Sequence, residues 1–164
     1  MINTDKTFCT YENIYYEMWE IAGRYTEIAQ FQVIGKSHDD RMIPMVQIGK
    51  GAETIFCIAG LSGRDQCMPV YLMHMLKEYV KAWECRWKLE NLYDLRALLE
   101  DWKICFIPLL NPDGYEIYEK DFYAIRNPIY RQMLRMQEIP CKEFICNSRG
   151  INLRKNFPTQ YYRR

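Results

Sequence analysis

The chain has 164 residues, a length typical of one domain, and its 49% hydrophobic and 26% charged residues predict a globular core and exclude a disordered chain. The formal net charge of +1 gives the whole chain no pull toward nucleic acid or acidic membranes. No apolar run approaches the roughly 18 to 20 residues that span a bilayer, and residues 1–6 do not resemble a signal peptide. We therefore expect a cytoplasmic protein with neither a membrane nor a nucleic-acid partner.

The cysteines also favour a reducing compartment. Seven are spread along the chain without a C-x-x-C pair, and the closest two, Cys141 and Cys146, do not have a usual zinc-ligand spacing. Cys57 and Cys105 lie inside apolar runs, where a thiol packs as a small hydrophobic group. Reduced structural thiols are the simplest interpretation.

The first third of the chain predicts a helix followed by three strands. Thr10 is a suitable N-cap for a helix over residues 11–24, in which apolar residues recur at helical spacing. Residues 28–37 and 42–48 read as the two strands of a hairpin, and residues 53–59 read as a third strand.

The rest of the chain alternates helices with one further strand. Pro69 suits the first turn of a helix over residues 70–87, and a polar break separates this helix from a shorter one that ends near Leu99. The run 103–110 is the most apolar strand and predicts burial on both faces. Asn127-Pro128 opens a last helix that ends near Met136.

This alternation predicts an α/β fold with a mixed central sheet flanked by helices. Ligands in such folds lie at the carboxyl ends of strands. Two candidates occupy that place: the loop Gly60 to Asp65 after the third strand, and the turn Asn111 to Gly114 after the most apolar strand.

The general catalytic motifs are absent from the sequence. There is no G-x-G-x-x-G, no Walker loop and no G-x-S-x-G, and only two histidines exist, His38 and His74. His38 falls in a polar hairpin turn, and His74 falls in the middle of a predicted helix. A Ser-His-Asp triad or a histidine-rich metal site is therefore not expected.

Five short segments, however, resemble the zinc carboxypeptidase family in order and spacing. The family's IGKS…GRPI hairpin resembles Ile34-Gly35-Lys36-Ser37 with Arg41-Met42-Ile43, and its AGIHGRE loop resembles Ala59 to Asp65 (AGLSGRD). Its NPDGYE motif matches Asn111 to Glu116, and a segment of its bacterial branch resembles Ala124 to Pro128 (AIRNP). Its NARGVDLNRNFP motif resembles Asn147 to Pro158 (NSRGINLRKNFP). The likeness covers nearly the whole chain from about Tyr11. It implies a truncated zinc-carboxypeptidase-like (phosphorylase/hydrolase-like) fold over residues 1–164.

The resemblance places a zinc loop at Ala59–Asp65, but with altered ligands. The family has a histidine where this chain has Ser62, and a glutamate where it has Asp65. A neutral hydroxyl is a poor zinc ligand, and aspartate is one methylene shorter than glutamate. In the family the third ligand, the catalytic glutamate and a substrate-capping tyrosine lie beyond the position that Arg164 occupies here. We therefore expect no zinc cofactor and no hydrolysis by the family mechanism.

The resemblance also marks positions that bind substrate. An arginine borders the substrate groove of the family where this chain has Arg64, which could instead pair with Asp65 or Asp113. The Asn-Arg pair that grips a terminal carboxylate corresponds to Arg154-Lys155. These two cations could still hold an anion, although a solvated basic tail over residues 149–164 is the simpler explanation.

Three functions stay open from the sequence. The leading one is a degenerate, catalytically silent carboxypeptidase-like domain that binds a peptide or protein partner or is an evolutionary remnant. We expect it to self-associate through an exposed sheet edge, or to pair with a partner that supplies the missing half. The second is the N-terminal part of a metallocarboxypeptidase, acting on peptides or cell-wall stem peptides, that a missing segment completes. The third, a basic-tail module for anions such as nucleic acid, is disfavoured by the near-neutral charge.

Overall fold

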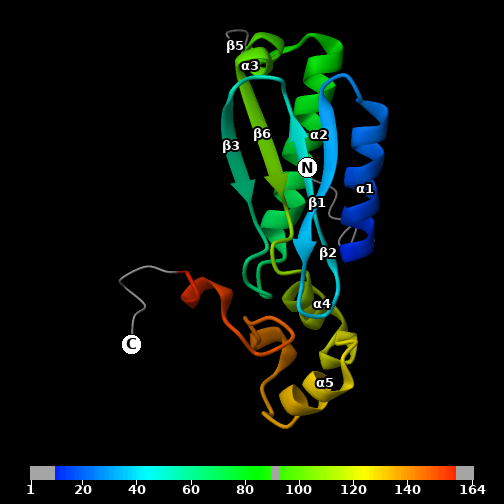
Figure 1. The fold of residues 1–164 in the computed structure, drawn as a ribbon, viewed down its shortest axis with the longest axis vertical. Helices are drawn as coiled ribbons and strands as arrows, with labels where there is room; N and C mark the ends of the chain where they lie inside the picture. Colours follow the sequence, from blue (N-terminus) through cyan, green and yellow to red (C-terminus); the bar gives the residue numbers. More distant parts are fainter. Residues whose placement is uncertain (1–9, 90–92, 158–164) are drawn as a thin grey trace.

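A four-stranded mixed sheet organises the structure, a computed structural model that describes residues 10–89 and 93–157. The strands stand in the order β1-β2-β6-β3, with β1 (Ala29–Lys36), β2 (Met42–Ile48), β6 (Trp102–Ile107) and β3 (Glu53–Ile58). β1 and β2 form the predicted antiparallel hairpin, β2 runs antiparallel to β6, and β3 runs parallel to β6. The α/β class with a mixed sheet is confirmed (Figure 1).

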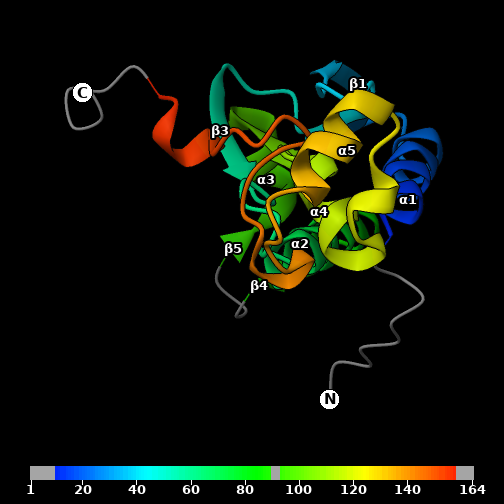
Figure 2. The same cartoon turned by 90° about the horizontal axis from the view of Figure 1, so that it is seen from below.

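Two helices cover one face of this sheet. α1 (Tyr11–Arg24) begins at the predicted cap, where the hydroxyl of Thr10 accepts a hydrogen bond of 3.2 Å from the amide of Asn13. α2 (Cys67–Cys85) follows the loop after β3, and Figure 2 shows both helices on the same side of the strands. Alternate strand residues pack with them, and the most deeply buried members of this core are Ile14, Met18, Val46, Ile48, Leu76, Leu95, Leu99, Phe106, Leu109 and Tyr115. Residues three or four positions apart on the helices and alternate residues on the strands therefore pack into one core.

Strand β6 has the burial that its composition predicted. Ile104 and Phe106 face the helices, whereas Cys105 and Ile107 join Met45 in a smaller cluster on the other face. β6 is central and buried on both faces, while β3 lies at the edge of the sheet. The two edge strands of this sheet are β1 and β3.

Short elements connect α2 to β6. The strands β4 (Lys88–Leu89) and β5 (Tyr93–Asp94) pair with each other, and α3 (Leu95–Asp101) corresponds to the predicted shorter helix. The aspartate at position 94 caps α3 by accepting a hydrogen bond of 2.9 Å from the amide of Arg96.

A small C-terminal lobe lies beyond the carboxyl ends of β3 and β6 (Figure 1). It contains α4 (Pro112–Lys120), η2 (Phe122–Ala124), α5 (Pro128–Arg135), η3 (Cys141–Glu143) and η4 (Leu153–Lys155). Its own core consists of Ile117, Phe122, Ile125, Leu134 and Phe144. The helix predicted from Asn127-Pro128 is confirmed as α5.

One predicted turn is corrected. Asn111 to Gly114 does not close a loop but starts α4, which the sequence reading missed. The side-chain oxygen of Asn111 accepts a hydrogen bond of 3.0 Å from the amide of Gly114, and Pro112 occupies the first helical position. An asparagine cap followed by proline is a helix-start signal as well as a turn signal. None of the helices in the described ranges is long and apolar enough to cross a membrane.

Candidate functional site

The two candidate segments meet at the carboxyl end of the sheet. Because β3 and β6 are parallel neighbours, the residues that follow them emerge side by side. The amide of Leu110 donates to the carbonyl of Ala59 at 3.1 Å, and the amide of Asn111 donates to the carbonyl of Gly60 at 2.8 Å. The loop after β3 and the start of α4 therefore form one continuous structure.

Two glycines let the backbones of these segments touch. A Cβ atom on Gly63 would lie 2.7 Å from the carbonyl oxygen of Gly114, and one on Gly114 would lie 3.0 Å from the Cα of Gly63. Any side chain here would push the loop off the helix start. The glycines of the two motifs thus have a packing role that does not involve metal.

The carboxylate of Asp65 accepts hydrogen bonds from nearby backbone amides. One carboxylate oxygen accepts a hydrogen bond of 3.1 Å from the amide of Gly60, and the other accepts one of 3.3 Å from the amide of Met68 in the first turn of α2. A carboxylate at this place satisfies helix-start amides that lack a partner inside the helix. The side chain closes the loop onto α2, so both oxygens already have backbone donors.

Ser62 also bonds within the loop. Its hydroxyl oxygen accepts a hydrogen bond of 3.4 Å from the amide of Arg64. Together Ser62 and Asp65 offer one neutral oxygen and one carboxylate whose oxygens both accept backbone hydrogen bonds. This pair does not fit a catalytic zinc, which needs three protein ligands. Within residues 10–89 and 93–157, no group of three or more histidine, cysteine, aspartate or glutamate side chains could hold a metal ion.

The three predicted substrate-binding cations lie at the surface. Arg64 is exposed, and in the described part of the chain it forms an ion pair with neither Asp65 nor Asp113. Arg154 and Lys155 are exposed in η4, the last element of the C-terminal lobe. Neither cation has a carboxylate partner among the described residues.

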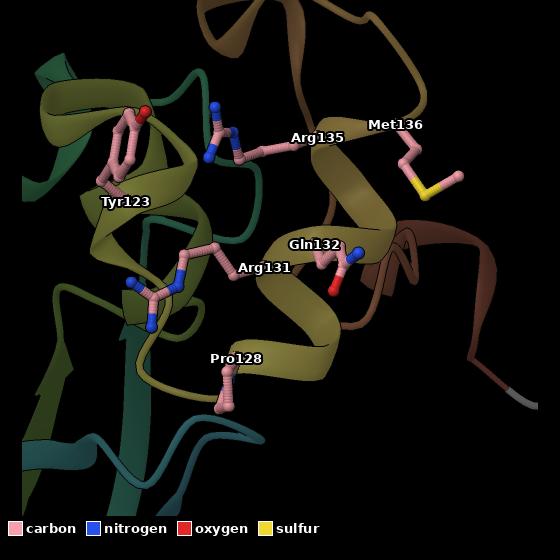
Figure 3. A pocket seen from close by; sticks show the side chains of 6 residues that line it. All are labelled: Tyr123, Pro128, Arg131, Gln132, Arg135 and Met136. Atoms are coloured by element: carbon pink, nitrogen blue, oxygen red, sulfur yellow. The ribbon is translucent and has the colours of Figure 1, made fainter.

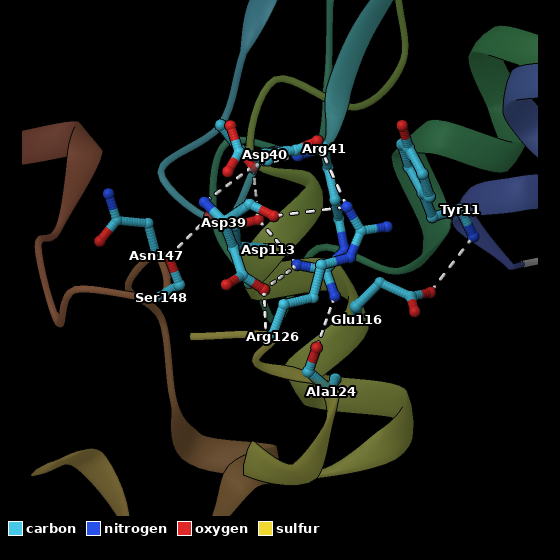
Figure 4. Close-up of polar contacts among 12 residues, drawn as sticks. Tyr11, Asp39, Asp40, Arg41, Asp113, Glu116, Ala124, Arg126, Asn147 and Ser148 are labelled. Carbon is cyan, nitrogen blue, oxygen red and sulfur yellow. Dashed lines mark hydrogen bonds and ion pairs between the residues drawn. The ribbon is translucent and has the colours of Figure 1, made fainter. Parts of the chain in front are cut away.

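Beneath these loops lies a buried ionic cluster that the sequence did not reveal (Figure 4). The Nη1 atom of Arg41 donates to Asp39 at 2.7 Å and to Asp113 at 2.9 Å, and these three side chains are at most 4% exposed. Its Nη2 atom donates to the carbonyl of Ala124 at 2.6 Å. One guanidinium thus joins the β1–β2 hairpin to α4 and η2.

Hydroxyl and amide donors complete the shell of the two carboxylates. Asp113 accepts hydrogen bonds from the hydroxyls of Ser37 at 2.6 Å and Ser148 at 2.9 Å. Asp39 accepts from the amides of Arg126 at 2.8 Å and Asn127 at 2.9 Å. Buried carboxylates need such partners to offset their lost hydration.

The charge state of Arg41 follows from this shell. Burial alone lowers the pKa of its guanidinium, but hydrogen bonds and charge from Asp39 and Asp113 outweigh burial and raise the pKa above its ordinary value. Arg41 therefore stays cationic throughout the accessible pH range.

Four of the five family-like segments contribute residues to the cluster. Ser37 and Arg41 belong to the hairpin segment, Asp113 to NPDGYE, Ala124 to Asn127 to the fourth segment, and Ser148 to the fifth. The fifth also has a tight turn, since the side-chain oxygen of Asn147 accepts hydrogen bonds of 3.0 Å from the amides of Arg149 and Ile151. The family resemblance marks these segments, but the sequence alone does not show that they contact one another.

The fold is an α/β fold in which the two candidate segments meet at the carboxyl ends of a mixed sheet. The model of a family described as zinc carboxypeptidase matches residues 14–164, and the chain therefore belongs to this family.

Individual relatives are distant and longer. Metallocarboxypeptidase A of Trichophyton rubrum is 24% identical over 165 residues, which cover 98% of this chain and 35% of that protein. Bovine thrombin-activatable fibrinolysis inhibitor, solved in complex with tick carboxypeptidase inhibitor, matches with a TM-score of 0.60 at 15% identity over 84% of this chain and 36% of its own. A metallo-carboxypeptidase from Burkholderia cenocepacia matches with a TM-score of 0.59 at 14% identity over 88% and 32%.

The structural likenesses establish the fold, and the chain spans about a third of the length of the curated relatives it matches. These relatives come from several organisms, so the assignment to the bacterial branch stays a prediction.

Proposed function

We propose that this chain is a catalytically silent carboxypeptidase-like domain that binds a peptide or protein partner. The observation that supports the proposal is the pair Ser62 and Asp65, a neutral hydroxyl beside a carboxylate whose oxygens accept hydrogen bonds from the amides of Gly60 and Met68. Asp65 could supply one anionic zinc ligand, and Ser62 supplies no second one.

Zinc titration tests this proposal directly. Calorimetry and metal analysis of the purified chain should show no stoichiometric tight zinc. The double variant Ser62→His, Asp65→Glu should gain only modest affinity, because two ligands do not complete a catalytic site. Asp65→Asn is the matched control, since it keeps the side-chain shape and should leave the titration unchanged. Tight stoichiometric zinc in the unaltered chain would refute the proposal.

The partner-binding half of the proposal rests on Arg64, Arg154 and Lys155. All three are exposed cations without a carboxylate partner in the described residues, and guanidinium groups bind carboxylates with directed hydrogen bonds. A free peptide carboxylate is the ligand they suit. A peptide that binds equally well with its terminus amidated would argue against this role.

Self-association through β3 forms part of the same proposal. Phe56 is 60% exposed, Ile55 and Ile58 are exposed beside it, and in the described residues β3 pairs with β6 alone. An apolar edge strand readily pairs with another strand. Antiparallel pairing of two copies about Phe56 would place Ile55 opposite the partner's Cys57 and Thr54 opposite the partner's Ile58, with no charges opposed.

Light scattering after gel filtration would test the β3 pairing. The unaltered chain should be dimeric and Phe56→Lys monomeric. Val33→Lys is the control because Val33 is 44% exposed on the opposite edge strand, β1. A monomeric unaltered chain with little binding of a hydrophobic dye would contradict the idea.

The alternative function is part of an active metallocarboxypeptidase that further residues complete. Membership of the zinc carboxypeptidase family is compatible with this alternative, whereas Ser62 weighs against it. Peptide hydrolysis after mixing the chain with the remaining portion of a related enzyme would establish it. We further propose a cytoplasmic location for a single short domain, supported by the six free cysteines of the described residues.

A further inference from the structure

A groove in the C-terminal lobe lies between η2 and α5, outside the loop that resembles a zinc site. It has a volume of about 560 Å³, a size typical of sites for small ligands or short peptide segments. Figure 3 shows the side chains around it, which are Tyr123, Pro128, Arg131, Gln132, Arg135 and Met136. No acidic residue is among them.

Two arginines give the groove its charge. Arg131 and Arg135 are four residues apart on α5 and therefore lie on the same helix face. Within residues 10–89 and 93–157 neither guanidinium has a carboxylate partner. Like charges at this spacing repel one another, so an anion held between them would stabilise both.

The walls of the groove are apolar and aromatic. The guanidinium carbon of Arg135 lies 4.6 Å from the ring centroid of Tyr123, a cation–π contact that holds the guanidinium over the ring. Pro128 and Met136 add apolar surface. A bare inorganic ion would leave these walls uncovered, whereas a peptide with acidic and apolar side chains would contact both kinds of surface.

Charge is distributed unevenly along the chain, and this distribution favours a short peptide over a nucleic acid as the ligand. Residues 126–157 contain seven lysines and arginines and two glutamates, a net charge of +5, whereas the whole chain has +1. The remainder is thus net negative and would repel a long polyanion. A short acidic segment can reach the basic lobe without meeting the negative part.

We propose that the groove between η2 and α5 binds a short acidic peptide segment, with Arg131 and Arg135 holding its carboxylates and Tyr123 and Met136 contacting its apolar side chains. This site is separate from Ser62 and Asp65. It therefore holds whether or not the zinc titration supports the function proposed above.

Fluorescence anisotropy with two labelled peptides tests the proposal. The first combines glutamates with a tyrosine and a leucine, and the second replaces each glutamate by glutamine. The chain should bind the acidic peptide at about 0.15 M salt, where the screening length is about 8 Å, and should bind the glutamine peptide at least about tenfold more weakly. Equal binding of the two peptides would overturn the proposal.

Charge-removing variants locate the site. Arg131→Gln and Arg135→Gln should each weaken the acidic peptide by about threefold to fivefold, the range of exposed ion pairs, and the double variant by more. The control is Arg24→Gln, because Arg24 also stacks on an aromatic ring, 5.3 Å from the Tyr25 centroid, but belongs to α1. Equal losses in the control and the groove variants would overturn the assignment. Matching circular dichroism spectra and melting temperatures would show that the variants fold.

Competition distinguishes other anions. Inorganic phosphate or a short single-stranded RNA that displaces the labelled peptide as effectively as unlabelled acidic peptide would overturn the choice of a peptide ligand. Amide chemical-shift changes on adding the acidic peptide should concentrate in residues 122–136. Changes centred on the loop 60–65 instead would also overturn it.

Discussion

Replacing Arg41 by alanine should destabilise the protein more than any surface substitution. The change removes hydrogen bonds to Asp39, Asp113 and Ala124 and leaves two carboxylates, each 1% exposed, without their cation. Breaking a buried ion pair from one side costs about 3–5 kcal/mol. Asp39 and Asp113 each keep two other donors, and the buried Nε of Arg41 has no partner among the described residues, so we expect about 3 kcal/mol.

Thermal and urea unfolding followed by circular dichroism measure this loss. For a chain of this size, about 3 kcal/mol corresponds to a fall in melting temperature of roughly 6–12 °C. Arg24→Ala is the control, since its side chain is 71% exposed and lies 3.9 Å from Glu84, and it should change stability by less than about 0.5 kcal/mol. If Arg41→Ala unfolds together with this control, the buried cluster does not stabilise the fold and the reasoning fails.

Four further outcomes follow from contacts in the loop, α1 and α2. Asp65→Ala should lose about 1 kcal/mol of unfolding free energy through the missing acceptor at the start of α2, whereas equal stability of Asp65→Ala and Asp65→Asn would contradict that role. Gly63→Ala should lower the melting temperature, because its Cβ would meet backbone at 2.7 Å; an unchanged melting temperature would show that the loop can shift freely. Burial raises the pKa of the Tyr11 phenol in the folded protein. The stability that this shift contributes is fully present below the unfolded pKa of about 10 and is lost as pH rises through the higher folded pKa. The free energy of unfolding should therefore fall less steeply at alkaline pH in Tyr11→Phe than in the unaltered protein. Alkylation at neutral pH should label the exposed Cys67 and Cys85 first, and mass spectrometry that finds the buried thiols labelled equally fast would indicate an open structure.

Local signals predicted the elements well where they did not depend on distant partners. α1 begins and ends as expected because Thr10 supplies its cap and its apolar stripe faces one core. The start of α4 was missed because Asn-Pro-Asp-Gly is typical both of a turn and of a capped helix, and only the fold around it decides. The burial of Asp39 and Arg41 could not be predicted, because a polar hairpin turn becomes buried only when residues more than 70 positions later pack on it.

The candidate site was also predictable only in part from the sequence. The resemblance located Ser62 and Asp65 at the carboxyl end of β3, where the structure places them. It could not reveal that the carboxylate bonds to the amides of Gly60 and Met68, since these contacts depend on loop conformation. The groove on α5 also had no sequence signal, because arginines four residues apart on a surface helix are common.

The buried cluster has a consequence for folding during synthesis. The β1–β2 hairpin can form early, but Asp113 lies 72 residues after Arg41 and Ser148 lies 35 residues after Asp113. At about 5–20 residues per second, the ribosome adds Ser148, the last hydroxyl donor to Asp113, roughly 5–20 s after Arg41. Before Asp113 and the residues after it are added, Arg41 and Asp39 lack the partners that these residues supply. The C-terminal lobe thus completes the shell of the buried cluster last. A nascent chain that stalls before Ser148 would leave Asp113 without one of its two hydroxyl donors.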